Sequence, residues 1–169
     1  MKFIPVLLVA ALLGIDQLTK YWAANVLSTQ GDVMLWPNVF HFTYVENRGA
    51  AFGMLQNQQW FFIIMTVVVL IFILWYWKQI PSNKWGGWMK FALILIISGA
   101  IGNLIDRVVL GYVVDFLYFI LIDFPVFNVA DICVVVGVGL LMPILLFGDI
   151  EPEKVTSEEE TKNVEIEGN

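Results

Sequence analysis

The chain has 169 residues, 59% of them hydrophobic, and its mean hydropathy is +0.78. Soluble domains seldom reach such values, so the composition predicts an integral membrane protein of one domain. Residues 1–148 hold seven basic and seven acidic side chains, so the net charge of −6 comes from residues 149–169. The membrane part therefore offers no basic surface for nucleic acid. One cysteine and one histidine are too few ligands for a usual zinc site, and we expect no metal and no cofactor.

The first predicted span covers about residues 3–24. Its charged start and apolar run would also suit a signal peptide, but three further spans follow and no clear cleavage site precedes Asp16. Asp16 and Lys20 are spaced i, i+4, so on a helix they can pair. We interpret the pair as a structural salt bridge at the outer end of the span; a direct chemical role is the alternative.

Residues 25–57 form the first large segment that does not span the membrane. Phe40, Phe42 and Tyr44 alternate with other residues, which predicts a strand in a small extramembrane sheet or cradle. His41 on this strand is expected to be a surface or hydrogen-bonded histidine rather than a catalytic base. The small residues of the segment 46–53 allow close backbone approach, so it could hold an extended peptide or a lipid head group; a plain loop is equally compatible.

Three more spans are predicted at about residues 58–77, 91–107 and 126–147, from long apolar runs with tryptophan and small residues. Residues 1–148 are thus expected to form one four-helix transmembrane domain, all-α apart from the small β-cradle. Residues 149–169 are acidic and lack apolar periodicity, which predicts a disordered tail. The modest bias of lysines predicts that both termini are cytoplasmic.

Several polar side chains fall at one depth in the predicted helices. With a rise of about 1.5 Å per residue, Asp16, Asp106 and Asp131 all lie in the outer part of the bilayer. A carboxylate there is costly unless it is paired or hydrated, so the convergence indicates a site. Amides share helix faces with these charges, as the i, i+3 and i, i+4 spacings of two asparagines show. These are Asn128 with Asp131, and Asn103 with Asp106 and Arg107.

Asp115 and Asp131 flank a short connection between the last two spans, and two neighbouring carboxylates can divide the work of peptide hydrolysis. One stays protonated and donates to the carbonyl oxygen, while the charged one takes a proton from the attacking water. Asp106 paired with Arg107 would then support the site. From the residues alone, a proton or ion carrier and a purely structural helix bundle stay open as alternatives.

Five blocks together resemble the bacterial lipoprotein signal peptidases, also called signal peptidase II, over residues 3–147. The blocks, in the order and approximate spacing of that family, are Asp16-Gln-Leu-Thr-Lys20, Asn47-Arg-Gly-Ala-Ala-Phe-Gly53, Gly102-Asn-Leu-Ile-Asp-Arg107, Val114-Asp-Phe116 and Phe127-Asn-Val-Ala-Asp131. None of them is a generic motif, so their agreement is specific. The acidic tail after Gly148 is longer than the motifs require, and we assign it no catalytic role.

The resemblance implies a four-helix membrane aspartyl endopeptidase of the bacterial inner membrane, with its active site near the outer face. Its partners would be membrane phospholipids and prolipoproteins, which it would cut before a cysteine that carries a diacylglyceryl group. Residues 32–46 would correspond to the cradle. Carried over block by block, the roles fall into three groups: catalytic, Asp115 and Asp131; substrate-binding or site-shaping, Asn47, Asn103, Arg107 and Asn128; structural, Asp16, Lys20 and Asp106.

Overall fold

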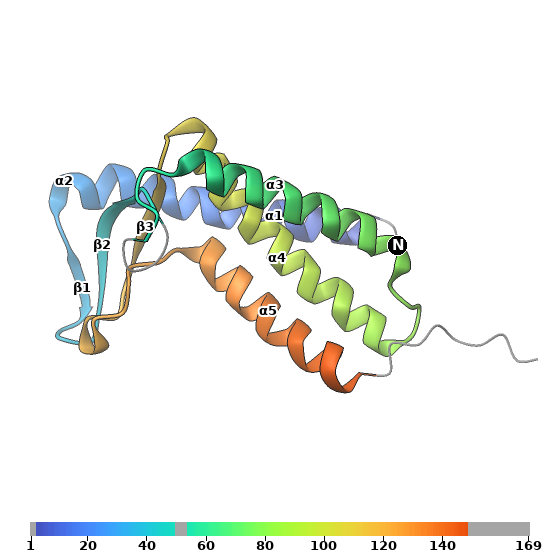
Figure 1. The fold of residues 1–169 in the computed structure, drawn as a ribbon. Coiled ribbons are helices and arrows are strands. Elements are labelled where there is room, and N and C mark those ends of the chain that lie inside the picture. Colours follow the sequence, from blue (N-terminus) through green and yellow to red (C-terminus); the bar gives the residue numbers. More distant parts are fainter. Residues whose placement is uncertain (1–2, 50–53, 149–169) are drawn as a thin grey trace, which may run out of the picture.

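The computed structural model describes residues 3–49 and 54–148, and Figure 1 shows four long helices side by side with a small sheet at one end. The predicted tail of residues 149–169 lies outside the described residues. Within the described part, four helices are long and apolar enough to cross a membrane. They are α1 (Ile4–Trp22), α3 (Gln59–Tyr76), α4 (Lys84–Val109) and α5 (Val129–Phe147). A π-helical turn (Ala23–Leu27) and the short α2 (Ser28–Gln30) prolong α1, and a short 3₁₀ turn (Trp77–Gln79) follows α3.

Two helices begin at different residues from those expected, and side-chain caps explain both. Asn83 caps α4: its Oδ1 accepts from the backbone N of Gly86 at 2.9 Å, so the helix starts at Lys84, before the expected residue 91. Asn128 caps α5 in the same way, and that helix starts at Val129 rather than 126. The caps satisfy backbone N–H groups that the first turn of a helix leaves free.

Helix α4 is the centre of the bundle, because it packs against α1, α3 and α5. Two glycines allow the close approach. A Cβ atom at Gly102 would lie 2.5 Å from Asp16 Oδ2 of α1, and one at Gly99 would collide with the carbonyl oxygen of Ala130 on α5. The glycines therefore bring three helices together at the level of their polar side chains.

The predicted strand exists, and it lies in the middle of an antiparallel sheet with the order β1-β2-β3. The strands are β1 (Val33–Trp36), β2 (Phe40–Asn47) and β3 (Val113–Tyr118). The rings of Phe42 and Phe116 pack on Trp22 at the end of α1, which anchors the sheet to the bundle. A short 3₁₀ turn, Ile120–Ile122, follows β3.

The expectation that His41 is a surface or hydrogen-bonded residue is wrong. Its side chain is only 6% exposed, and its Nε2 has no hydrogen-bond partner among the described residues. Sheet formation explains the burial, because His41 has Met34 of β1 on one side and Tyr118 of β3 on the other.

Candidate active site

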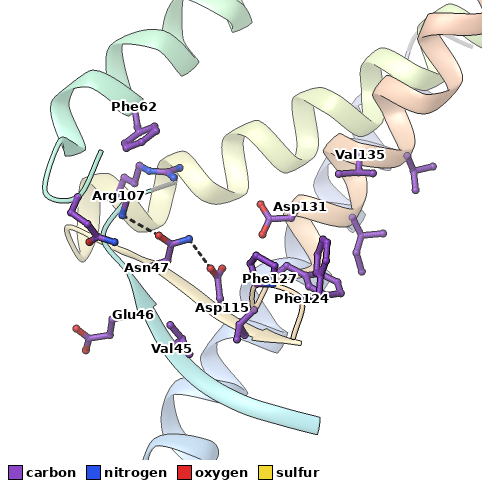
Figure 2. A pocket seen from close by; sticks show the side chains of 16 residues that line it. Val45, Glu46, Asn47, Phe62, Arg107, Asp115, Phe124, Phe127, Asp131 and Val135 are labelled. Carbon is purple, nitrogen blue, oxygen red and sulfur yellow. Dashed lines mark hydrogen bonds between the residues drawn. The ribbon is translucent and has the colours of Figure 1, made fainter. Parts of the chain in front are cut away.

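Asp115 lies in the middle of β3, opposite Val45 of β2. Side chains two apart on a strand share a face, so Asn47, two residues beyond Val45, lies on the same face as Asp115. Its Nδ2 donates to Asp115 Oδ2 at 2.9 Å, as Figure 2 shows. Asp115 is 2% exposed, so the sheet holds a buried carboxylate against an amide donor.

Asp131 lies in the first turn of α5 and forms a reciprocal capping box with Asn128. The backbone N of Asp131 donates to Asn128 Oδ1 at 2.9 Å, and the backbone N of Asn128 donates to Asp131 Oδ2 at 3.1 Å. An acidic side chain at a helix N-terminus is also favoured by the helix dipole. The predicted shared face of Asn128 and Asp131 is confirmed, and the cap fixes how Asp131 points.

Two amides connect the two carboxylates. Asn128 Nδ2 donates to Asp115 Oδ1 at 2.6 Å and to Asn103 Oδ1 at 3.1 Å, while Asn103 Nδ2 donates to Asp131 Oδ1 at 2.8 Å. With the bonds from Asn47 and from the Asn128 backbone, every oxygen of both carboxylates receives an N–H donor. The pair is therefore held in place by donors from three separate elements.

Lys20 is the centre of a buried charge cluster beneath this pair. Its Nζ lies 3.0 Å from Asp16 Oδ2 and 3.0 Å from Asp106 Oδ2, and it donates to Asn103 Oδ1 at 2.9 Å. The predicted pair of Asp16 with Lys20 is confirmed, but the predicted pairing of Asp106 with Arg107 is wrong. Adjacent residues on a helix point in different directions, so Asp106 faces Lys20 of α1 while Arg107 faces elsewhere.

The two acids of this cluster also hold the backbone next to the carboxylate pair. Asp106 Oδ2 accepts from the backbone N of Val114 at 3.1 Å, and Asp16 Oδ1 accepts from the backbone N of Ala130 at 2.9 Å. Val114 precedes Asp115 in the chain, and Ala130 precedes Asp131. The cluster of Lys20, Asp16 and Asp106 therefore supports the backbone of both β3 and the start of α5.

Gln17 belongs to the same cluster and was missed by the sequence reasoning. Its Nε2 lies 3.1 Å from Asp16 Oδ2, 3.1 Å from Asp106 Oδ1 and 3.3 Å from the carbonyl oxygen of Gly102. The signal was its position one residue after Asp16 in a polar turn at the end of an apolar run. Its amide links α1 to α4 by hydrogen bonds.

Asp115 and Asp131 both line a cavity of about 660 Å³. Figure 2 shows it bounded by the sheet, by Phe124 and Phe127, and by Val135 on α5. Val135 is 69% exposed on the apolar face of that helix, so the cavity continues toward the lipid. The two carboxylates thus lie with a few other polar side chains in a cavity whose walls are largely apolar.

Arg107 of α4 also lines the cavity and packs over the ring of Phe62, with 4.8 Å between its Cζ and the ring centroid. Its Nε has no hydrogen-bond partner among the described residues. A buried donor without a partner is unusual, so Arg107 has the capacity to bind a further acceptor in the cavity.

Burial, and after it the nearby charge of Asp131, raise the pKa of Asp115 to about 7. The hydrogen bonds from Asn47 and Asn128 and the charge of Lys20 oppose this rise. A carboxyl group with such a pKa keeps a substantial share of its protons near neutral pH. The site can therefore hold one proton next to a second carboxylate, which is the requirement for acid–base catalysis by two aspartates. Within residues 3–49 and 54–148, no three acidic, histidine or cysteine side chains lie close enough to hold a metal ion.

The family model described as "Signal peptidase (SPase) II" matches residues 8–147. The chain belongs to the signal peptidase II family. It is 49% identical over 142 residues to the lipoprotein signal peptidase of Clostridioides difficile (strain 630), covering 84% of this chain and 94% of that protein. It is 50% identical over 143 residues to the lipoprotein signal peptidase of Caldanaerobacter subterraneus subsp. tengcongensis, covering 84% and 95%.

Solved structures agree with this membership. Two structures titled as a bacterial membrane enzyme, at 1.9 and 2.3 Å resolution, match this chain with TM-scores of 0.74 and 0.73 and 34% and 32% identity. The first match covers 86% of this chain and 93% of the solved one, and the second 90% and 92%. The chain is therefore a multi-pass membrane protease of the signal peptidase II family, with the predicted four-helix fold.

Proposed function

We propose that this chain is an aspartyl endopeptidase that removes the signal peptide from prolipoproteins, cutting before a cysteine that carries a diacylglyceryl group. The observation that carries the proposal is the amide-linked pair of Asp115 and Asp131 in one cavity. Its family relatives named lipoprotein signal peptidase support the substrate class. The aspartic mechanism rests on the site itself.

In the proposed reaction Asp115 starts protonated and Asp131 starts as the carboxylate. Asp131 takes a proton from water while the water oxygen attacks the scissile carbonyl, and Asp115 donates its proton to the carbonyl oxygen. The resulting diol collapses as its hydroxyl proton returns to Asp115 and Asp131 protonates the leaving amine. The raised pKa of Asp115 supports its role as the acid. The bonds that Asp131 accepts from Asn103 and from the backbone of Asn128 fix the orientation of its carboxyl group.

The apolar walls of the cavity support a lipid-bearing substrate. Phe62, Ile132, Val135 and Val136 could contact acyl chains or the end of the signal peptide, with membrane phospholipids around them. Asn47, Asn103, Arg107 and Asn128 would bind the substrate backbone or shape the site. In the proposed orientation the protein lies in the bacterial cytoplasmic membrane, with both termini cytoplasmic and the cavity near the outer face.

The experiment that tests this proposal asks whether cleavage requires the diacylglyceryl group on the cysteine of the precursor. Purified protein in detergent is incubated with one precursor in two forms, with and without diacylglyceryl on the cysteine, and the products are identified by mass spectrometry. The proposal predicts cleavage of the lipidated form alone, directly before the modified cysteine. Equal cleavage of both forms would contradict the substrate class, and acid-driven flux in liposomes with no cleavage would favour an ion carrier instead.

A further inference from the structure

Asn47 lies between two charged residues that interact on the opposite side of the strand. Neighbouring side chains of a strand point to opposite faces, and Figure 2 shows Glu46 pointing away from Asp115. Arg48 Nη2 donates to Glu46 Oε2 at 2.7 Å, and the Arg48 guanidinium lies 5.1 Å from the ring centroid of Tyr112. Tyr112 directly precedes β3, so Arg48 joins the end of β2 to the start of the strand that carries Asp115.

The main chain of Arg48 is held as well. Its carbonyl oxygen accepts from the backbone N of Asn57 at 2.9 Å and from Gln59 Nε2, at the start of α3, at 2.8 Å. The backbone N of the next residue, Gly49, donates to Asn47 Oδ1 at 3.0 Å. That bond decides which way the Asn47 amide is turned, because it occupies the oxygen and leaves Nδ2 directed at Asp115.

We propose that Arg48, with Glu46 and Tyr112, forms a latch that positions Asn47 over Asp115. The proposal rests on the proposed function, since its effect on the reaction passes through Asp115. Arg48 does not touch the reacting atoms; it is a positioning residue that fixes the backbone on which the Asn47–Gly49 bond depends. The contact is half exposed, with 49% of the Arg48 side chain and 38% of Glu46 accessible, so the latch can open without unfolding the bundle.

Loss of the latch is expected to change the pKa of Asp115 in one direction, which the pH dependence of kcat/KM can measure. The charged groups that interact with Asp115 are Asp131 of α5, Lys20 of α1 and Arg107 of α4. Glu46 of the latch also lines the cavity, but its side chain points away from Asp115 (Figure 2). The hydrogen bond from Asn47 favours the charged form of Asp115, so weakening this bond raises the pKa of Asp115. Asp115 then keeps its proton to higher pH. The alkaline limb of the profile, in which kcat/KM falls as pH rises, therefore moves to higher pH.

The experiment measures kcat/KM against pH for the lipidated precursor with three variants. Arg48→Met keeps an unbranched stem over Tyr112 but removes the charge; it is expected to move the alkaline limb up by about half a pH unit and to lower kcat/KM about two- to fivefold. Arg48→Lys keeps the charge and is expected to retain most of the parental profile. Lys84→Met is the matched control, because Lys84 Nζ also lies over an aromatic ring, 5.3 Å from the Trp85 centroid, at the first residue of α4 and so at the opposite end of that helix from Asn103 and Arg107.

The decisive comparison is Arg48→Met in an Asn47→Ala background. If Arg48 acts through Asn47, the second substitution changes neither the limb nor kcat/KM further. An equal loss in both backgrounds, or an unmoved limb in Arg48→Met, would overturn the latch. Asp115→Asn separates the two proposals. If Asp115→Asn is inactive and the alkaline limb is unmoved in Arg48→Met, the latch alone is refuted. If Asp115→Asn is fully active, the catalytic pair of Asp115 and Asp131 is refuted, and the latch with it.

Discussion

Replacing Lys20 by methionine tests the buried charge cluster. The Lys20 side chain is 3% exposed, and it is 3.0 Å from both Asp16 and Asp106. Methionine has a similar shape without the charge, so Lys20→Met leaves two buried carboxylates with no cation between them. It also removes the donor that orients Asn103 toward Asp131.

The expected cost follows from burial. Removing one partner of a buried ion pair destabilises a protein by about 3–5 kcal/mol, because the remaining charge keeps its desolvation penalty. Here one cation serves two carboxylates, so we expect the upper part of that range. For a chain of this size the loss corresponds to a fall in Tm on the order of 10 °C.

The single cysteine provides the assay. Cys133 is buried in α5, so a thiol-reactive dye reports its exposure as the detergent-solubilised protein is heated. Lys78→Met is the control, because Lys78 is exposed and its loss is expected to leave Tm unchanged. The double variant Lys20→Met with Asp106→Asn removes one of the stranded charges and should recover part of the loss. A Tm of Lys20→Met within 1–2 °C of the parent, roughly the shift produced by an ordinary surface substitution, would refute the account of a dry, tightly paired cluster.

Two further predictions concern the pH profile and the packing of the helices. The kcat/KM of the parent protein should fall as pH rises through about 7, where Asp115 loses its proton, and Asn47→Ala should move this limb to higher pH; a limb unchanged in the variant would contradict the role of that bond. Gly102→Ala should lower stability by about 1–3 kcal/mol, because its Cβ would lie 2.5 Å from Asp16 Oδ2, while Gly14→Ala, with no atom within 4 Å of the added Cβ, should not lower it. Thermal unfolding checks the glycine pair, and equal Tm values for both would count against the packing argument.

Local patterns in the sequence predict the parts of this protein that depend on nearby residues. The apolar runs predict four helices, the alternation around Phe42 predicts β2, and the i, i+3 and i, i+4 spacings predict the contacts of Asn128 with Asp131 and of Asp16 with Lys20.

Contacts between distant elements could not be predicted in this way. The segment carrying Asp115 was expected to be a connection, yet it forms β3. Its strand partner β2 lies about 70 residues earlier in the chain, so no local pattern predicts this pairing. The register of β2 with β3 brings Asn47 to Asp115, and no spacing in the sequence encodes it. Asp106 was assigned to its neighbour Arg107, whereas its real partner is Lys20 on another helix.

We propose above that Asp115 and Asp131 act together as the catalytic pair. The most direct measurement is the rate of cleavage of the lipidated precursor by Asp115→Asn, Asp131→Asn and the double variant, each with a Tm that shows it is folded, and with Asp32→Asn, an exposed acid, as the control. We expect each single substitution to lower kcat by about 10²–10⁴-fold, the double variant to be little slower than the worse single variant, and Asp32→Asn to be unaffected. Cleavage at the parental rate by either folded single variant would contradict it.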